Sequence, residues 1–461
     1  MTRGKIVQEL QLHALMTDGC VEVEDTPERH DLLLLKLTIL SSARFTGFAQ
    51  HQTKSGLESS SQKGTSNRSR RVTIASLLPS PFYRSASAAL LEPPGAVSNA
   101  AEETSGLRLR DSFGRAITDL RISVTDRCNY KCVYCRAGNE VASYTELPIA
   151  HYLRMVRVLV SLGIEKVRLT GGEPLLRSGL VEMVAELAQM RTAYAADGTR
   201  LDAREPGQPL DIALTTNGHL LESLAAPLAS AGLNRVTVSM DAVDPETFAR
   251  ITRVPGSFQR VLAGVHAAQA AGLGPVKINC VLLRGFNDSQ IEPFAEFSRR
   301  QAVVVRFIEF MPLEEPSAAE DARTWRPETV VPMDEIVARL SAWRPSCGVP
   351  AGLAELPPRA ASETARRFTF ADGIGEIGII APVSRPFCGH CSRLRITSDG
   401  ALRTCLFSQS DHDLFGQMRR GGTDEELAAY IRRVVLRKEA RHHIGEPGFE
   451  KPSRNMVHIG G

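Results

Sequence analysis

Residues 126–135 read Asp-Arg-Cys-Asn-Tyr-Lys-Cys-Val-Tyr-Cys, which places Cys128, Cys132 and Cys135 in a C-x3-C-x2-C spacing. Three thiolates on one short loop are enough to hold three irons of a cubane cluster. Iron–sulfur clusters held by cysteine usually have four thiolate ligands. The spacing therefore predicts a cluster in which one iron is left open to a ligand that is not protein.

Two simpler interpretations of this stretch stay open. A structural zinc site takes four thiolate or imidazole ligands, usually in two spaced pairs, whereas residues 126–135 supply three in one run. A disulfide framework is typical of short secreted chains, but this chain has 461 residues and only nine cysteines. We therefore favour a metal cluster held by reduced thiols.

A second cysteine triplet lies near the other end of the chain. Cys388, Cys391 and Cys405 follow the spacing C-x2-C-x13-C, with His390 between the first two. Half of a zinc ribbon, with His390 as the fourth ligand, is one interpretation. Chelation by His390 and both neighbouring cysteines is sterically awkward, however. The triplet therefore predicts a second cluster with one open iron.

The composition limits the classes of protein and of partner. The chain has 55 basic and 52 acidic residues and a formal net charge of +3, which argues against a general nucleic-acid binder. No apolar run reaches the roughly eighteen residues that are needed to span a membrane. A hydrophobic content of 43% allows a sizeable core, and the length allows more than one domain.

Residues 1–105 differ from the rest and are expected to be a disordered N-terminal extension. Between positions 41 and 100 only Glu58 and Glu92 are acidic, while Ser, Ala and Arg are frequent. Such leaders are typical of organelle transit peptides, which predicts a protein of the mitochondrial matrix. Acidic residues within 18–31 weaken this interpretation, and the alternatives are another organelle or the cytoplasm.

From Arg115 onward, short apolar runs alternate with segments of helical periodicity. This alternation implies parallel βα units, and six of them make an incomplete (β/α)6 TIM-like barrel of the α/β class over 106–343.

A Pro- and Ala-rich linker at about 344–364 opens the C-terminal part, 344–461, which is expected to be an α+β cluster-binding subdomain. A polar loop insertion is expected at 191–210. The predicted barrel strands are Leu120–Val124, Lys166–Thr170, Asp211–Thr215, Arg235–Ser239, Val276–Leu282 and Val303–Phe310. The clearest helical segments are His151–Leu162, Gly179–Met190, Ser257–Ala271 and Asp424–Glu439.

Small and polar residues follow several of the predicted strands, and chemistry in parallel barrels takes place at the carboxyl ends of the strands. The run Gly171-Gly172-Glu173-Pro174 follows the second strand. Its glycines allow close approach to a ligand, and its exposed carbonyls and carboxylate suit an ammonium group. Thr215-Thr216-Asn217-Gly218 and Ser239-Met240-Asp241 end later strands. Each run alone is also common in ordinary strand-end capping.

Cationic residues occupy strand positions where a charge is expensive unless it faces a polar cavity. Arg393 and Arg395 are two residues apart and therefore share one face of a strand. Paired guanidiniums suit a polyphosphate or a carboxylate, although a solvated strand face is the plainer alternative. The candidate cations are Arg121, Arg168, Lys277, Arg393 and Arg395. Together they predict an anionic ligand inside the barrel.

The two triplets, the Gly-Gly-Glu-Pro run, Arg393-Leu394-Arg395 and the terminal Gly460-Gly461 together resemble the GTP 3′,8-cyclase family of the radical S-adenosyl-L-methionine (SAM) superfamily. The resemblance covers about residues 105–461 and implies two 4Fe-4S clusters, SAM, and GTP as the substrate. The implied cluster ligands are Cys128, Cys132 and Cys135, and Cys388, Cys391 and Cys405. The implied SAM contacts are Tyr134, Gly172, Ser239 and Met311. The implied GTP contacts are Arg121, Arg168, Thr215, Lys277, Arg393, Leu394 and Arg395, and the Gly460-Gly461 tail is implied to enter the active site and to be needed for activity.

The resemblance also implies a reaction and a set of partners. SAM is cleaved to methionine and a 5′-deoxyadenosyl radical, which takes the ribose 3′ hydrogen of GTP. The carbon radical then attacks guanine C8, which makes the protein a lyase that begins molybdenum cofactor biosynthesis. The implied partners are an external electron donor and the downstream cyclic pyranopterin monophosphate synthase, and a homodimer is considered.

Two other functions are kept open. A radical SAM peptide-modifying enzyme with an auxiliary cluster shares the first triplet, although such C-terminal regions typically contain more cysteines. A non-catalytic scaffold with two zinc sites explains the cysteines but leaves the cationic strand positions without a purpose.

Overall fold

The structure is a computed structural model, and it describes residues 107–135, 146–202, 204–313, 324–345, 352–452, 454 and 456–460. The predicted extension at 1–105, its targeting role and the last residue, Gly461, lie outside the described residues. Within the part of the chain that is described, no helix has the length and apolar character needed to cross a membrane.

Six parallel strands form the centre of the sheet, in the same order as in the sequence. Every strand predicted for the barrel is present, and no observed end differs from the predicted one by more than one residue. The fold class, an incomplete barrel of βα units, is therefore confirmed. The strands are β1 (Asp119–Ser123), β2 (Lys166–Thr170), β3 (Asp211–Thr216), β4 (Arg235–Ser239), β5 (Lys277–Leu282) and β6 (Val304–Glu309).

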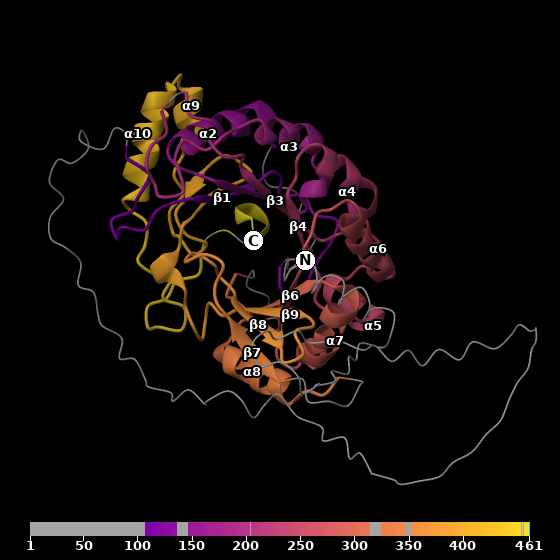
Figure 1. Ribbon diagram of the computed structural model, residues 1–461. Coiled ribbons are helices and arrows are strands. Elements are labelled where there is room, and N and C mark those ends of the chain that lie inside the picture. Colours follow the sequence, from indigo (N-terminus) through magenta and orange to yellow (C-terminus); the bar gives the residue numbers. More distant parts are fainter. Residues whose placement is uncertain are drawn as a thin grey trace, which may run out of the picture. The chain divides into compact units, whose positions relative to one another are not determined.

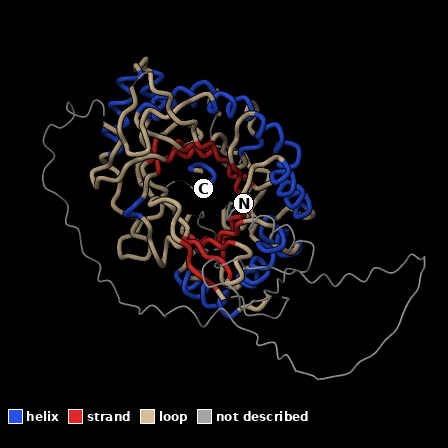
Figure 2. Tube along the Cα trace, viewed as in Figure 1, coloured by secondary structure: helices blue, strands red, loops and turns tan. Residues whose placement is uncertain are grey.

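Helices connect these strands and lie along the outer, convex side of the curved sheet (Figure 1). Figure 2 shows the same arrangement as an inner arc of strands with an outer ring of helices. The helices are α2 (Ile149–Ser161), α3 (Leu180–Ala188), α4 (Leu221–Ser230), α5 (Pro245–Thr252), α6 (Ser257–Ala270), α7 (Ile291–Gln301) and α8 (Met333–Ala342).

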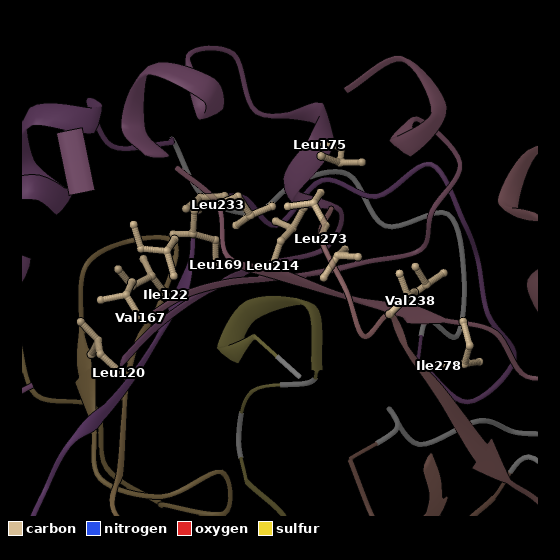
Figure 3. Close-up of a cluster of buried hydrophobic side chains, with 14 of the residues drawn as sticks. Leu120, Ile122, Val167, Leu169, Leu175, Leu214, Leu233, Val238, Leu273 and Ile278 are labelled. Atoms are coloured by element: carbon tan, nitrogen blue, oxygen red, sulfur yellow. The ribbon is translucent and has the colours of Figure 1, made fainter. Parts of the chain in front are cut away.

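The main core lies between the sheet and these helices. Side chains alternate along each strand, so that Leu120, Ile122, Val167 and Leu169 face the helices and are fully buried. Figure 3 shows this apolar layer above the sheet, with the last helix of the chain on the opposite side. The residues between the apolar ones, Arg121 and Arg168 among them, therefore face the concave side.

The strands of the C-terminal part extend the same sheet at both of its edges. Strand β10 (Arg393–Ile396) pairs in parallel with β1, and β9 (Glu376–Ile380) pairs in parallel with β6. The sheet therefore has eleven strands in the order β11-β10-β1-β2-β3-β4-β5-β6-β9-β8-β7 and is open at its two edge strands. The remaining elements are β7 (Leu353–Leu356), β8 (Arg366–Phe370), β11 (Leu402–Arg403), α9 (Leu414–Arg419), α10 (Asp424–Val435) and α11 (Met456–Ile459).

The predicted linker contains a strand that the sequence did not indicate. Strand β7 pairs antiparallel with β8, from Leu353 opposite Phe370 to Leu356 opposite Arg367. Ala354 and Glu355 are exposed, so the strand has no buried apolar face that a sequence pattern reveals. A hairpin turn at Gly400 joins β10 to β11. The loop predicted at 191–210 contains only isolated bridges among its described residues, as expected.

Candidate active site

A cavity of about 570 Å³ lies on the concave side of the sheet. Its lining runs from Asp119 and Lys166, at the amino ends of β1 and β2, to Gly172 and Ser239, at carboxyl ends. This volume is within the range of sites that enclose a nucleotide-sized ligand. The cavity therefore gives one ligand access to both ends of the parallel strands.

The first cysteine triplet lies at the carboxyl end of this cavity. Cys128, Cys132 and Cys135 all line it and are half-buried. A backbone hydrogen bond joins their loop to α5: the N–H of Val133 donates to the carbonyl of Ile251, near the end of that helix, at 3.0 Å. Three thiols that line one cavity from a single loop fit the ligand set of a cluster with one iron left open.

The Gly-Gly-Glu run packs directly against the cysteine loop. A Cβ at Gly172 would lie 2.3 Å from the carbonyl oxygen of Arg127, and a Cβ at Gly171 would lie 2.4 Å from that of Thr125. Backbone hydrogen bonds join the two segments, from the N–H of Gly172 to Thr125 O at 2.8 Å and from that of Glu173 to Arg127 O at 2.7 Å. The glycines are therefore needed for contact with the chain itself, and Gly172 also lines the cavity.

The carboxylate of Glu173 has a different role from the one its motif suggested. It is fully buried and accepts hydrogen bonds from Leu175 N at 2.9 Å, Thr216 Oγ1 at 2.6 Å and Asn217 N at 2.7 Å. Burial raises its pKa to about 7, and the three hydrogen bonds oppose this change. The carboxylate is therefore held by groups that follow β2 and end β3, and it is not among the residues that line the cavity, so it is not placed to receive a ligand ammonium.

Tyr134 is held over the cavity by a buried carboxylate. Its hydroxyl donates to Asp241 Oδ2 at 2.7 Å, while Asp241 Oδ1 accepts from Val281 N at 2.8 Å. Burial raises the pKa of Asp241 to about 6 and that of Tyr134 well above its usual range. Ser239 and Met311 line the same part of the cavity, so the predicted SAM contacts lie together there.

Arginines on three neighbouring strands stand in register on the concave face. Arg121 is directly opposite Arg395 on β10 and Arg168 on β2. Like charges in directly opposed positions destabilise a sheet. An alignment of this kind is therefore expected where an anion binds between the side chains.

Burial and the close spacing of these positive charges lower the pKa values of several cations in the cavity. Burial, followed by repulsion from neighbouring arginines, lowers the pKa of Arg121 to about 9. Burial and repulsion also lower the pKa of Arg168 to about 9 and that of Lys277 to about 8. Arginine stays protonated in proteins, so these shifts represent a cost of keeping the charges, which a bound anion would offset.

Hydroxyl and amide groups orient the arginines. The Nη1 of Arg168 donates to Thr215 Oγ1 at 3.1 Å and to Thr237 Oγ1 at 3.3 Å. Arg306, on β6, donates to Thr237 Oγ1 at 3.2 Å and to Asn279 Oδ1 at 3.0 Å. Arg306 lines the cavity and was missed, although it occupies an inward strand position like the cations that were found.

Two more charged residues of the lining were missed for a different reason. Arg359 and Glu363 belong to the segment predicted as a linker, yet both line the cavity. Arg359 donates to Glu376 Oε2 at 2.9 Å. Because no strand or motif marks this segment, the sequence offers no signal for its position.

Leu394 does not share the position of its neighbours. Arg393 and Arg395 line the cavity, whereas the side chain of Leu394 is fully buried in the apolar core on the other side of β10. The alternation of side chains along a strand requires this difference. A side-chain contact between Leu394 and GTP is therefore excluded.

The second triplet lies beyond β10 and β11. Cys388 begins a short 3-10 turn, η5 (Cys388–His390), Cys391 directly follows it, and Cys405 follows β11; all three are half-buried. Although burial acts in the other direction, the charges of Arg393 and Lys438 lower the pKa of Cys391 to about 6. A thiolate beside two cations fits an anionic metal cluster. His390 is exposed, which does not favour it as a fourth ligand.

The carboxyl-terminal tail lies inside the curve of the sheet, where Figure 1 marks the end of the chain. Gly460 is buried and its carbonyl accepts from Arg395, as does that of Ile459 at 3.2 Å. Its φ is 68° and a Cβ would lie 2.6 Å from Thr170 Cγ2. The tail thus reaches the predicted site, and only glycine suits this position.

Comparisons with known proteins agree with this geometry. A family model of the radical SAM superfamily matches residues 122–298, and one for molybdenum cofactor synthesis, C-terminal part, matches residues 303–444. A GTP 3′,8-cyclase of Acidothermus cellulolyticus is 41% identical over 345 residues, which are 72% of this chain and 87% of that protein. The enzyme of that name from Moorella thermoacetica is 40% identical over 77% of this chain and 100% of its own length. The one from Corynebacterium glutamicum is 39% identical over 77% of this chain and 89% of its own length.

Proposed function

The chain belongs to the GTP 3′,8-cyclase family of the radical SAM superfamily, and we propose from its cavity how it converts GTP to (8S)-3′,8-cyclo-7,8-dihydro-GTP in the first step of molybdenum cofactor biosynthesis. Its cofactors are two 4Fe-4S clusters and SAM. The observation that carries the proposal is that the first cysteine triplet and the arginine row line a single cavity.

The carboxyl end of the cavity is assigned to SAM. Cys128, Cys132 and Cys135 would hold the cluster that binds SAM, and this pair would supply the 5′-deoxyadenosyl radical. Tyr134, Gly172, Ser239 and Met311 form the wall against which SAM lies, with Tyr134 oriented by Asp241. This wall excludes water and other hydrogen donors from the radical site.

The arginine row is assigned to the GTP triphosphate. Arg121, Arg168, Lys277 and Arg395, with Arg306, bring fixed positive charge to one side of the cavity, and Thr215 orients Arg168. Arg393 lies between this row and Cys391, so it contacts the nucleotide near the second cluster. Holding both ends of GTP fixes its 3′ hydrogen relative to the radical, which is catalysis by orientation. In this assignment the Gly460-Gly461 tail closes the cavity against Arg395.

We propose the partners from the family to which the chain belongs and the location from the composition of residues 1–105. The reaction requires an external one-electron donor, and its unstable product requires the downstream cyclic pyranopterin monophosphate synthase. Homodimer formation is tested by the mass of the protein in solution. Mitochondrial targeting by residues 1–105 is tested by fusing them to a reporter protein and assaying its import.

The function is tested with anaerobically reconstituted protein, GTP, SAM and dithionite, followed by mass spectrometry. A cyclised GTP isomer together with 5′-deoxyadenosine supports the proposal. Formation of 5′-deoxyadenosine with GTP unchanged would instead indicate another substrate, such as a peptide. Absence of acid-labile sulfide, with zinc present, would indicate the scaffold function.

A further inference from the structure

Lys438 is a buried cation that does not take part in the cavity. Only 3% of its surface is exposed. Its Nζ donates to the carbonyl oxygen of Arg393 at 3.0 Å and to that of Thr404. Among the residues that the structure describes, no carboxylate forms an ion pair with it. A buried ammonium bonded only to carbonyls is costly unless a negative charge lies near.

The two carbonyls belong to the segments that carry the second triplet. Arg393 follows Cys391 by two residues, and Thr404 directly precedes Cys405. Lys438 therefore joins the backbone at the start of β10 to the backbone that follows β11, close in sequence to Cys391 and Cys405. The backbone of the third cysteine is held by another buried cation, because the guanidinium of Arg115 donates to the carbonyl of Cys388 at 2.7 Å.

The thiols of Cys391 and Cys405 belong to the two segments whose carbonyls receive the Lys438 ammonium, so negative charge on those thiols lies near a buried positive charge. A buried ammonium held at both backbones favours negative charge on the groups that these segments carry. A cluster held by three thiolates adds further negative charge at this place when it is reduced. The potential of an iron–sulfur cluster depends on the net charge and hydrogen bonds around it.

We propose that Lys438 is a positioning residue for the second cluster, which fixes the segments of Cys391 and Cys405 and raises the reduction potential of the cluster through its buried charge. The inference rests on the proposed function, because it assumes that this triplet holds iron and sulfide. It goes beyond that function in assigning the redox behaviour of the cluster to a residue that contacts neither SAM nor GTP.

Glu439, the residue after Lys438, carries the opposite charge, so its substitution should shift the reduction potential of the second cluster in the opposite direction. Glu439 Oε2 accepts from Thr404 Oγ1 at 2.7 Å, so a carboxylate also faces the segment of Cys405. Its negative charge acts on Cys405 against the thiolate form. Glu439→Gln keeps the size and the acceptor oxygen while it removes the charge. It should therefore raise the potential, whereas Lys438→Met should lower it.

The experiment uses the full chain in which Cys128, Cys132 and Cys135 are all replaced by Ala, so that only the second cluster is present. Iron and sulfide are determined first, and the potential is then measured by electron paramagnetic resonance during anaerobic titration. Lys438→Met is expected to lower the reduction equilibrium constant at least tenfold, a shift of about 59 mV for one electron. Lys438→Arg should restore most of it.

Two controls separate this role from a loss of stability. Arg299 is a buried cation far from the second triplet in the sequence, and its guanidinium donates to Asp372 at 2.9 Å. Arg299→Met should therefore lower the melting temperature without changing the reduction potential of the second cluster. Opposite shifts in Lys438→Met and Glu439→Gln support the proposal. Equal potentials in Lys438→Met, Glu439→Gln and the parent overturn it, and if Lys438→Met does not fold, an unchanged potential in Glu439→Gln overturns it as well. A parent without iron and sulfide contradicts the proposed function instead.

Discussion

Gly172→Ala is expected to remove the first cluster and leave the second in place. The added Cβ would lie 2.3 Å from the carbonyl oxygen of Arg127, whereas ordinary contacts begin near 3.4 Å. The two backbones must therefore separate by about 1 Å, and neither is a side chain that can rotate away. Overpacking of this kind typically costs about 1–3 kcal/mol.

That separation acts on the loop that holds three of the cluster ligands. The hydrogen bonds from Gly172 N to Thr125 O and from Glu173 N to Arg127 O join the loop to β2, and both are stretched by the substitution. We expect the global melting temperature to fall by only a few degrees, because the sheet itself is unchanged. The cysteine loop, which these bonds support, should lose its geometry first.

The assay is iron and sulfide content after anaerobic reconstitution. The parent should hold about eight irons and Gly172→Ala about four, since each cubane cluster contains four. Gly389→Ala is the matched control: it lies between Cys388 and Cys391, yet a Cβ there meets nothing within 4 Å. It should keep both clusters. Full iron content and SAM cleavage in Gly172→Ala would refute the reasoning.

Three further predictions concern the cavity. Arg306→Met should weaken GTP binding about tenfold to a hundredfold, the usual effect of losing a charged hydrogen-bond donor, while SAM cleavage without GTP persists; unchanged GTP affinity in equilibrium dialysis would contradict this. Lys277 has a pKa lowered to about 8 by burial and neighbouring arginines, so it loses its charge as the pH rises through 8. GTP affinity should therefore fall between pH 7 and 9, and an equally steep fall in Lys277→Met would show that another group titrates. Gly460→Ala brings a Cβ to 2.6 Å from Thr170 Cγ2 at a φ of 68°, which should displace the tail from Arg395. Limited proteolysis should then cut the tail faster, with the melting temperature nearly unchanged, and equal cutting rates would contradict this account.

The sequence predicts the centre of the fold well because the two-residue alternation of strands and the 3.6-residue periodicity of helices are both strong there. In β1 and β2 the alternation of apolar and charged residues places Arg121 and Arg168 on one face and Leu120 and Val167 on the other. The same rule, applied to β10, separates Leu394 from Arg395. The predicted contact of Leu394 with GTP can therefore come only from its backbone, because its side chain is buried in the core.

Other features depend on tertiary contacts that leave no local pattern. Strand β7 exists because its backbone pairs with β8, although Glu355 and its neighbour are exposed. Glu173 follows two glycines as a ligand-binding carboxylate would, yet Thr216 and Asn217 occupy its oxygens from a different strand. Arg359 reaches the cavity from a segment without any motif. The role of Lys438 cannot be predicted from the sequence, because it depends on the carbonyls of Arg393 and Thr404 meeting at its ammonium group.

The central claim is that the cavity holds GTP with its 3′ hydrogen next to the site where the radical forms. The most direct measurement is the reaction of anaerobically reconstituted protein with GTP that carries deuterium at C3′, followed by mass spectrometry of 5′-deoxyadenosine. The account predicts one deuterium in 5′-deoxyadenosine and a cyclised nucleotide in matching amount. Unlabelled 5′-deoxyadenosine, with the labelled GTP recovered intact, would contradict it.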